Sequence, residues 1–165
     1  DGSLTGYNVW KWIDYDNYNY PYAGAGSPDF STNWIILRYA EIYLNDAEAR
    51  LETGDVEGAR KAVNMIRQRV GLPDLTESDP EKLRELIRKE RRIEFAFEEQ
   101  RFYDVRRWKI GPETQTTLHG VRFVSPTEFK VTKTDIRTWN DRLYLTPVPH
   151  DEIVRSSVLK QNPGY

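Results

Sequence analysis

The pattern of apolar residues predicts two packed helices between residues 34 and 71. One apolar stripe at helical spacing consists of Ile36, Ala40, Tyr43, Leu44, Ala47 and Leu51. Gly54 is a natural C-terminal cap for this helix, and Asp55 can cap the N-terminus of a second one. The second stripe consists of Val56, Ala59, Val63, Ile66 and Val70. The two helices are therefore predicted to form an antiparallel hairpin, similar to one tetratricopeptide-type unit.

A third, long helix is predicted from residue 80 to about residue 108. Ser78 or Asp79 followed by Pro80 and Glu81 is a strong helix start, and no Gly or Pro interrupts the run that follows. Such a helix would reach about 40 Å at 1.5 Å per residue. Its apolar stripe consists of Leu83, Leu86, Ile87, Ile93 and Phe97. Glu90, Glu94 and Arg101 fall close to the same face, and charges in such positions need partners.

The remaining segments are less regular. Residues 1–33 combine many aromatic residues with Asn, Asp, Gly and Pro, which predicts an irregular loop. Apolar and polar residues alternate in residues 121–124 and 128–131, on either side of a Ser-Pro turn, which predicts a small β-hairpin. A third strand is possible at residues 143–145. A short helix is expected around residues 151–156. The predicted fold class is mainly α, organised as an aromatic-rich loop (1–33), a three-helix block (34–110), a loop with a β-hairpin (111–146) and a C-terminal tail (147–165).

Composition and charge narrow the classes of function. The 165 residues include 24 Lys plus Arg and 26 Asp plus Glu, so nucleic acid is not an expected partner. The sequence has no cysteine, which excludes disulfides, thiolate nucleophiles and zinc–thiolate sites. No apolar run approaches the roughly 18 residues needed to cross a bilayer, and the first residues are not a secretion signal. If the protein is exported, its targeting element is expected to have been removed or to lie upstream of this sequence.

Charged residues on the predicted helices allow two interpretations. Two acidic residues near an apolar wall could perform acid–base chemistry, as in a glycoside hydrolase. Carboxylates and guanidinium groups alternate along the third helix, however, and the first two helices supply further partners, which favours a structural ion network. The predicted network consists of Arg38, Glu41, Glu48, Arg67, Arg69, Glu90, Glu94, Glu98, Arg101 and Asp104. We therefore assign no catalytic residue.

Other motifs for metals, nucleotides or nucleophiles are missing from the sequence. His119 and His150 lie far apart and have no carboxylate or second histidine at zinc-ligand spacing. No nucleophile elbow, phosphate-binding Gly loop or dinucleotide fingerprint occurs. Residues 14–17 offer oxygen ligands for calcium but lack the Gly and the distal Glu of an EF-hand loop. We predict neither a metal site nor a cofactor.

Aromatic side chains of the N-terminal loop are the best candidates for ligand contact. Tyr and Trp rings have apolar faces and a polar edge, which suit sugar rings or the surface of a partner. The alternative is that these rings fasten the loop to the helices beneath it, and both interpretations stay open. The candidate ligand-binding residues are Trp12, Tyr15, Tyr18, Tyr20, Tyr22 and Trp139.

Five sequence blocks in the right order resemble the SusD/RagB family. They are ILRYAEIYL with AEA within residues 36–49, NMIRQRVGLP at 64–73, ERRIEFAFE with RFYDVRRW within 90–108, YLTPVP at 144–149, and QNPGY at 161–165. Each block alone is a weak signal. Together they cover roughly residues 34–108 and 143–165, and the match is specific.

The resemblance implies a tetratricopeptide-like scaffold in a larger lipoprotein on the outer face of a Bacteroidetes-type outer membrane. The implied partner is a SusC-like TonB-dependent transporter, and the implied ligand is an oligosaccharide or polysaccharide, or a peptide in RagB-like members. The resemblance implies no enzymatic activity, and membrane attachment only through a lipid anchor outside this sequence. Because family members are several times longer, we expect the sequence to be a C-terminal region. The matched motifs belong to the scaffold and imply no ligand-binding residue.

Three functions follow as competing predictions. The favoured one is non-catalytic capture of a glycan for import. The second is a helical-repeat scaffold that binds a peptide or a protein. The third is a glycoside hydrolase that uses carboxylates of the third helix.

Overall fold

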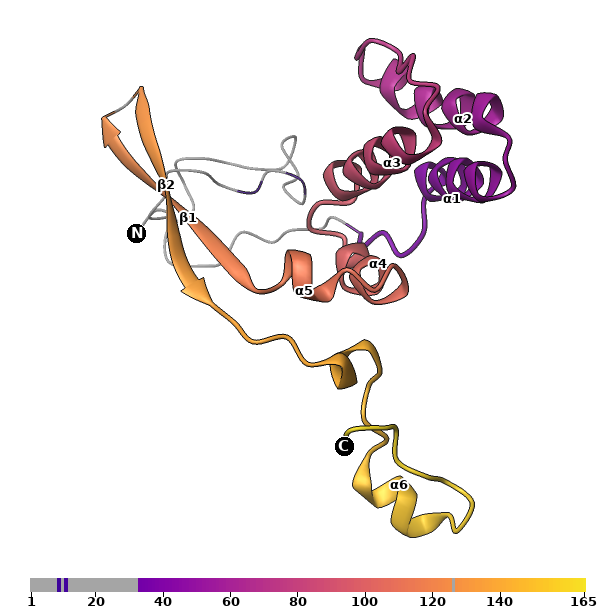
Figure 1. Ribbon diagram of the computed structural model, residues 1–165, viewed down its shortest axis with the longest axis vertical. Helices are drawn as coiled ribbons and strands as arrows, with labels where there is room; N and C mark the ends of the chain where they lie inside the picture. Colours follow the sequence, from indigo (N-terminus) through magenta and orange to yellow (C-terminus); the bar gives the residue numbers. More distant parts are fainter. Residues whose placement is uncertain (1–8, 10, 12–32, 126) are drawn as a thin grey trace. The chain divides into compact units, whose positions relative to one another are not determined.

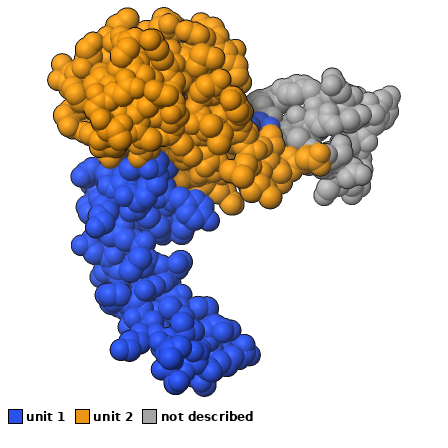
Figure 2. Space-filling model, turned by 90° about the vertical axis from the view of Figure 1, so that its right-hand side faces the viewer, with its two compact units in different colours: residues 1–30, 102–165 blue, residues 31–101 orange. Residues whose placement is uncertain are grey.

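The computed structural model describes residues 9 and 11, residues 33–125 and residues 127–165. The predicted ligand residues Trp12, Tyr15, Tyr18, Tyr20 and Tyr22 lie outside these ranges. The chain forms two compact units, one of residues 31–101 and one of residues 1–30 and 102–165. Figure 2 draws residues 31–101, called the first unit below and unit 2 in the key of the figure, in orange. The described part of the other unit, called the second unit below and unit 1 in the key, is blue.

Three helices build the unit of residues 31–101 (Figure 1). They are α1 at Tyr39–Glu52, α2 at Val56–Arg69 and α3 at Pro80–Glu94. The turn from α1 to α2 is tight because Gly54 adopts a φ of +89°, in the left-handed region that glycine tolerates. Asp55 then caps α2 by accepting a 2.8 Å hydrogen bond from the Gly58 N–H. Asp79 caps α3 in the same way. The predicted helical hairpin is confirmed.

An apolar core holds the three helices together. Its buried side chains are Ala40, Leu44, Ala47, Leu51, Ala59, Ala62, Val63, Ile66, Leu83, Ile87 and Phe95. Small alanine side chains on the facing sides of α1 and α2 allow the two backbones to approach closely. Buried Asn64 fixes the connection to α3, because its side chain donates to the Leu75 carbonyl at 3.1 Å and accepts from the Leu75 N–H at 2.8 Å.

The third helix is shorter than the sequence pattern predicts. A continuous helix to residue 108 is wrong, because α3 ends at Glu94 and α4, Gln100–Arg107, starts after a break. Phe97 and Glu99 in the break both have a φ of +64°, a left-handed conformation that an α-helix cannot contain. The break brings Phe95 into the core at 3% exposure, whereas Phe97 of the predicted stripe is 64% exposed. Burial of the Phe95 ring offsets the cost of the two left-handed residues.

The ends of the predicted stripes are also corrected. Ile36 precedes α1 and is 77% exposed, because Arg38 before the helix is extended. Val70 follows α2 at its C-cap and is exposed, and so is Ile93 on the last turn of α3. The predicted stripes therefore hold in the middle of each helix and are wrong at these positions.

The described part of the second unit contains a hairpin and short helices. Its elements are α5 at Gly111–Thr114, β1 at Thr117–Ser125, β2 at Glu128–Ile136, the 3₁₀ helix η1 at Asp141–Tyr144 and α6 at His150–Arg155. Antiparallel pairing of β1 with β2 confirms the predicted hairpin. The possible third strand at residues 143–145 is wrong, because Asn140 accepts a hydrogen bond from the Arg142 N–H and starts η1. The short helix predicted in the tail is confirmed as α6.

Side-chain hydrogen bonds to the backbone fasten the C-terminal tail. Gln161 donates to the Val148 carbonyl at 2.9 Å and accepts from the Val148 N–H at 2.8 Å. Its amide thus forms the pair of hydrogen bonds that two residues of neighbouring antiparallel strands exchange. Asn162 donates to the Thr146 carbonyl at 2.6 Å, and the Tyr165 hydroxyl donates to a backbone carbonyl at residue 145. These contacts fold the tail back on residues 144–148.

None of the helices within the described ranges has the length and apolar character needed to cross a membrane.

Candidate functional site

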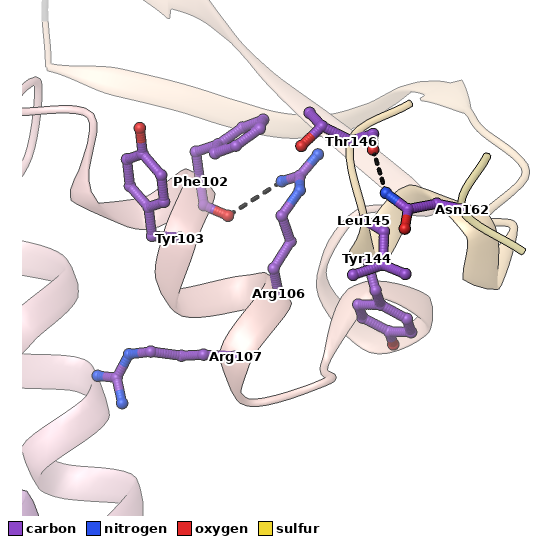
Figure 3. A pocket seen from close by; sticks show the side chains of 8 residues that line it. All are labelled: Phe102, Tyr103, Arg106, Arg107, Tyr144, Leu145, Thr146 and Asn162. Atoms are coloured by element: carbon purple, nitrogen blue, oxygen red, sulfur yellow. Dashed lines mark hydrogen bonds between the residues drawn. The ribbon is translucent and has the colours of Figure 1, made fainter. Parts of the chain in front are cut away.

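A pocket of about 520 Å³ lies in the second unit, next to α4 (Figure 3). Its volume is in the range of small-molecule sites. The lining residues are Phe102, Tyr103, Arg106, Arg107, Tyr144, Leu145, Thr146 and Asn162. Four of these residues belong to α4, three follow one another at residues 144–146, and one comes from the tail.

The α4 wall of the pocket combines aromatic rings with a cation. Phe102 and Arg106 are four residues apart, which places them on the same side of the helix. The Arg106 guanidinium carbon lies 3.4 Å from the centre of the Phe102 ring, and Nη1 donates to the Phe102 carbonyl at 3.0 Å. The neighbouring Tyr103 ring meets Phe102 edge-on at 5.2 Å and is 63% exposed. This wall therefore offers ring surface and positive charge side by side.

The opposite wall is positioned by hydrogen bonds. Tyr144 donates from its hydroxyl to the Lys109 carbonyl at 2.9 Å. The bond from Asn162 to the Thr146 carbonyl, drawn dashed in Figure 3, holds the tail against residues 144–146. The two hydrogen bonds between the Gln161 side chain and the Val148 backbone add a second attachment, so the tail is held beside residues 144–146.

The two arginines of the pocket differ in their partners. Arg107 extends away from the other lining side chains in Figure 3, and its Nε donates to buried Asp104 at 2.9 Å. Arg106 extends between Phe102 and Thr146. It makes no ion pair with any residue of the described chain. Its Nε is buried and finds no acceptor among the described residues. The described lining contains no carboxylate, so the pocket has a net positive charge.

Trp139 is the one predicted ligand residue that the structure describes. Its indole lies flat on Gly111, where an added Cβ would come within 2.1 Å of the ring. The indole also packs at 5.0 Å on Tyr144, whose ring lines the pocket. Trp139 is half-buried and is not itself a lining residue. Its contact with a ligand stays a prediction.

In the first unit, Arg38 contacts two other residues of the predicted ion network, Glu94 and Glu98. Its Nε donates to Glu98 at 2.7 Å, Nη2 donates to the Glu94 carbonyl at 2.7 Å, and Nη1 pairs with the Glu94 carboxylate. Burial acts to lower the pKa of Arg38, but the hydrogen bonds to Glu98 and Glu94 outweigh it and raise this pKa. Arg69 pairs with the same Glu94 at 2.8 Å. The guanidinium ion of Arg38 thus ties the residue before α1 to the break after α3.

The other predicted network residues occupy separate places. Arg67 and Glu90 form a 2.7 Å ion pair between α2 and α3. Glu41 accepts a 3.4 Å hydrogen bond from Gln100. Glu48 on α1 and Arg101 on α4 are half-buried. Asp104 belongs to the second unit, where it pairs with Arg107.

The pocket was not predicted from the sequence. Phe102, Tyr103 and Arg106 lie in the block RFYDVRRW, which we assigned to the scaffold as a whole. The four-residue spacing of an aromatic residue and an arginine was the available signal for the Phe102–Arg106 stack. No local pattern connects this stack with Tyr144 and Asn162, which are far away in the sequence.

Comparison with known proteins places the chain in a family. The SusD family model matches residues 1–165, which is the entire sequence. This chain belongs to the SusD family. The membership that the sequence blocks predicted is therefore confirmed.

Relatives of known sequence or structure agree with this SusD-family assignment. SusD-like protein P2 of Formosa agariphila is 38% identical over 155 residues, covering 87% of this chain and 28% of that protein. SusD-like protein P25 of the same organism is 32% identical over 172 residues, covering 91% of this chain and 31% of the relative. A crystal structure of a SusD-like protein from Bacteroides fragilis is 98% identical with a TM-score of 0.86, covering 99% of this chain and 31% of that one. The chain thus spans about a third of the length of these relatives.

Proposed function

We propose that this SusD-family protein captures an oligosaccharide at the bacterial cell surface without catalysis and delivers it to a SusC-like TonB-dependent transporter. The family match over residues 1–165 carries the proposal. The proposal includes a location on the extracellular face of the outer membrane, with attachment through a lipid anchor outside the present sequence. Partner and ligand are proposed together, because binding a glycan for import requires a transporter that accepts it.

Two features of the described chain support binding rather than hydrolysis. The pocket beside α4 exposes aromatic rings next to an arginine and an amide, which are groups that suit a sugar ring and its hydroxyls. Glu94 and Glu98, the helix-borne carboxylates considered for acid–base chemistry, both accept hydrogen bonds from Arg38. A carboxylate committed to a guanidinium ion is poorly placed to give or take a proton in a reaction.

We further propose that the N-terminal aromatic residues take part in ligand contact. These residues are Trp12, Tyr15, Tyr18, Tyr20 and Tyr22, with Trp139 as a sixth candidate. Alanine substitution of each one, followed by calorimetric titration with the glycan that the parent protein binds, tests this assignment. Loss of affinity with an unchanged melting temperature supports it, and unchanged affinity in all six variants contradicts it.

Affinity capture from membranes of the native bacterium tests the proposed function itself. The tagged protein is expected to bring down a TonB-dependent transporter and to bind soluble oligosaccharides without releasing reducing ends. Release of reducing sugar that is lost in Glu94→Gln and Glu98→Gln, but kept in the exposed α3 variant Glu85→Gln, would show a hydrolase instead. Capture of the transporter together with peptide rather than glycan binding would favour the scaffold that recognises peptides.

A further inference from the structure

The positive charge of the pocket beside α4, called the α4 pocket below, indicates a narrower class of ligand than glycans in general. We propose that this pocket binds the anionic group, a carboxylate or a sulfate ester, of an acidic sugar residue. The inference rests on the proposed glycan capture and adds a preference for acidic over neutral glycans. Its basis is Arg106, a half-buried cation without an acidic partner in the described chain.

Arginines in comparable surroundings show what Arg106 lacks. Arg38, Arg60, Arg67 and Arg84 are likewise half-buried, and each has a carboxylate within ion-pair distance. Arg106 donates only to the Phe102 carbonyl, and its Nε–H has no acceptor in the described chain. Partial removal of a guanidinium ion from water costs free energy when no carboxylate pairs with it, because nothing replaces the water molecules that it loses. An anion in the pocket would give this guanidinium ion the counter-charge that it lacks in the described chain.

The stack on Phe102 orients Arg106 for such an anion. Contact at 3.4 Å between the guanidinium carbon and the ring centre fixes the plane of the charged group over the ring. The Nη1 bond to the Phe102 carbonyl leaves Nη2 without a bond to the described chain. A planar, oriented guanidinium ion is the group best suited to accept a carboxylate or a sulfate through more than one N–H.

The rest of the lining favours a sugar as the carrier of the anion. Phe102 and Tyr103 are both exposed to a large degree, so ring surface is available for the C–H face of a pyranose. Asn162 lies on the opposite wall, where its carbonyl oxygen can accept from a sugar hydroxyl while its amide nitrogen holds Thr146. The pocket of about 520 Å³ has room for a sugar unit of this kind.

Titration of the purified protein, expressed at its full natural length, tests the inference. The probes are glucuronate, galacturonate and glucose 6-sulfate, each compared with glucose or galactose. Calorimetry gives the affinity, and the side-chain N–H signals of ¹⁵N-labelled arginine show which guanidinium responds. We expect at least one acidic sugar to bind saturably and to shift the Arg106 signal, while the neutral sugars leave that signal unchanged. The uronates and the sulfate distinguish the two kinds of anion.

Variants separate a role in binding from a role in folding. Arg106→Gln is expected to weaken acidic-sugar binding at least about tenfold, since it removes charge-assisted hydrogen bonds. Arg106→Lys keeps the charge but not the planar fork, and is expected to bind with intermediate affinity. Arg122→Gln removes the same charge from the exposed hairpin strand β1 and serves as the control. Each variant is compared at an unchanged melting temperature.

Three results would overturn the inference. They are equal binding of neutral and acidic sugars, no shift of the Arg106 signal with any acidic probe, and acidic-sugar affinity that survives in Arg106→Gln. Tighter binding of an acetylated tripeptide through its C-terminal carboxylate would assign the pocket to peptides instead. Neutral-glycan binding with capture of the transporter would leave the proposed function intact, whereas loss of all glycan binding and of the transporter would remove both.

Discussion

The two units of this chain stabilise their folds by different means. In residues 31–101, three helices bury an apolar core, and ion pairs such as that of Arg38 with Glu98 lie at its edge. In residues 102–165, strand β2 is exposed along its whole length, and side chains such as Gln161 hold the backbone through individual hydrogen bonds. A change in the first unit is therefore expected to affect the whole helical unit. A change in the second should act locally.

Removal of Arg38 is expected to have the largest effect. Arg38→Gln removes the 2.7 Å ion pair to Glu98, whose side chain is only 6% exposed. It also removes the hydrogen bond to the Glu94 carbonyl at the end of α3. Because breaking a buried ion pair is strongly destabilising, we expect a loss of about 3 kcal/mol in the free energy of unfolding. Urea denaturation followed by the helical circular dichroism signal measures it.

Arg69→Gln is the matched control for this comparison. Arg69 pairs with the same Glu94, but its side chain is 57% exposed. Solvent screening limits the value of such a pair, and we expect a loss of only about 0.5 kcal/mol. Equal losses in the two variants would contradict the view that burial gives the Arg38 cluster its importance.

The second unit is tested at Gln161, with a smaller and local effect. Gln161→Glu keeps an acceptor for the Val148 N–H but turns a carboxylate oxygen towards the Val148 carbonyl. Loss of this hydrogen bond is expected to lower the local stability of residues 147–165 by about 2 kcal/mol. Hydrogen exchange should rise in the tail and stay unchanged in α1 to α3. Lys160→Gln changes the net charge equally at a neighbouring exposed residue, and faster exchange in that variant too would argue against a specific role for Gln161.

The contrast between the units also explains which features could be predicted from the sequence. The α1–α2 hairpin was predictable because the spacing of residues such as Leu44 and Val63 and the cap at Asp55 are local signals. The break after α3 was not, because no Gly or Pro marks residues 95–99. It depends on the burial of Phe95 and on the bonds of Arg38 to Glu94 and Glu98, which no local pattern shows.

The candidate site, like the break after α3, depends on contacts between residues far apart in the sequence. The family was recognisable from contiguous blocks, since these blocks are read directly along the chain. The pocket requires α4, residues 144–146 and Asn162 to come together across long stretches of sequence, so a local pattern could not predict it. The predicted aromatic contacts in residues 12–22 stay predictions.

Substitutions to glycine test the break between α3 and α4, with a moderate expected effect. Glu99 is exposed and has a φ of +64°, which costs an L-residue about 1 kcal/mol or more and glycine almost nothing. We expect Glu99→Gly to raise the free energy of unfolding by up to about 1 kcal/mol, measured by urea denaturation. Glu85→Gly, the same change inside α3, is expected to lower it by about 1 kcal/mol. Destabilisation by both substitutions would show that residue 99 is not strained.

The smallest expected effect is the contribution of the Asp79 charge, at the N-cap of α3, to the pH dependence of stability. The pKa of Asp79 is lowered because its carboxylate accepts hydrogen bonds from the backbone N–H groups of Lys82 and Glu81. A lowered folded-state pKa contributes stability above the ordinary carboxyl value near about pH 4, and this contribution is lost as the pH falls through the lowered pKa. Asp79→Asn keeps a capping oxygen without a titrating charge, so its melting temperature should lie slightly below that of the parent at neutral pH and converge with it in acid. Asp79→Ala, which has no capping oxygen, should remain less stable than Asp79→Asn at every pH. A constant difference between the parent and Asp79→Asn across the acid range would mean that the charge at this cap contributes nothing.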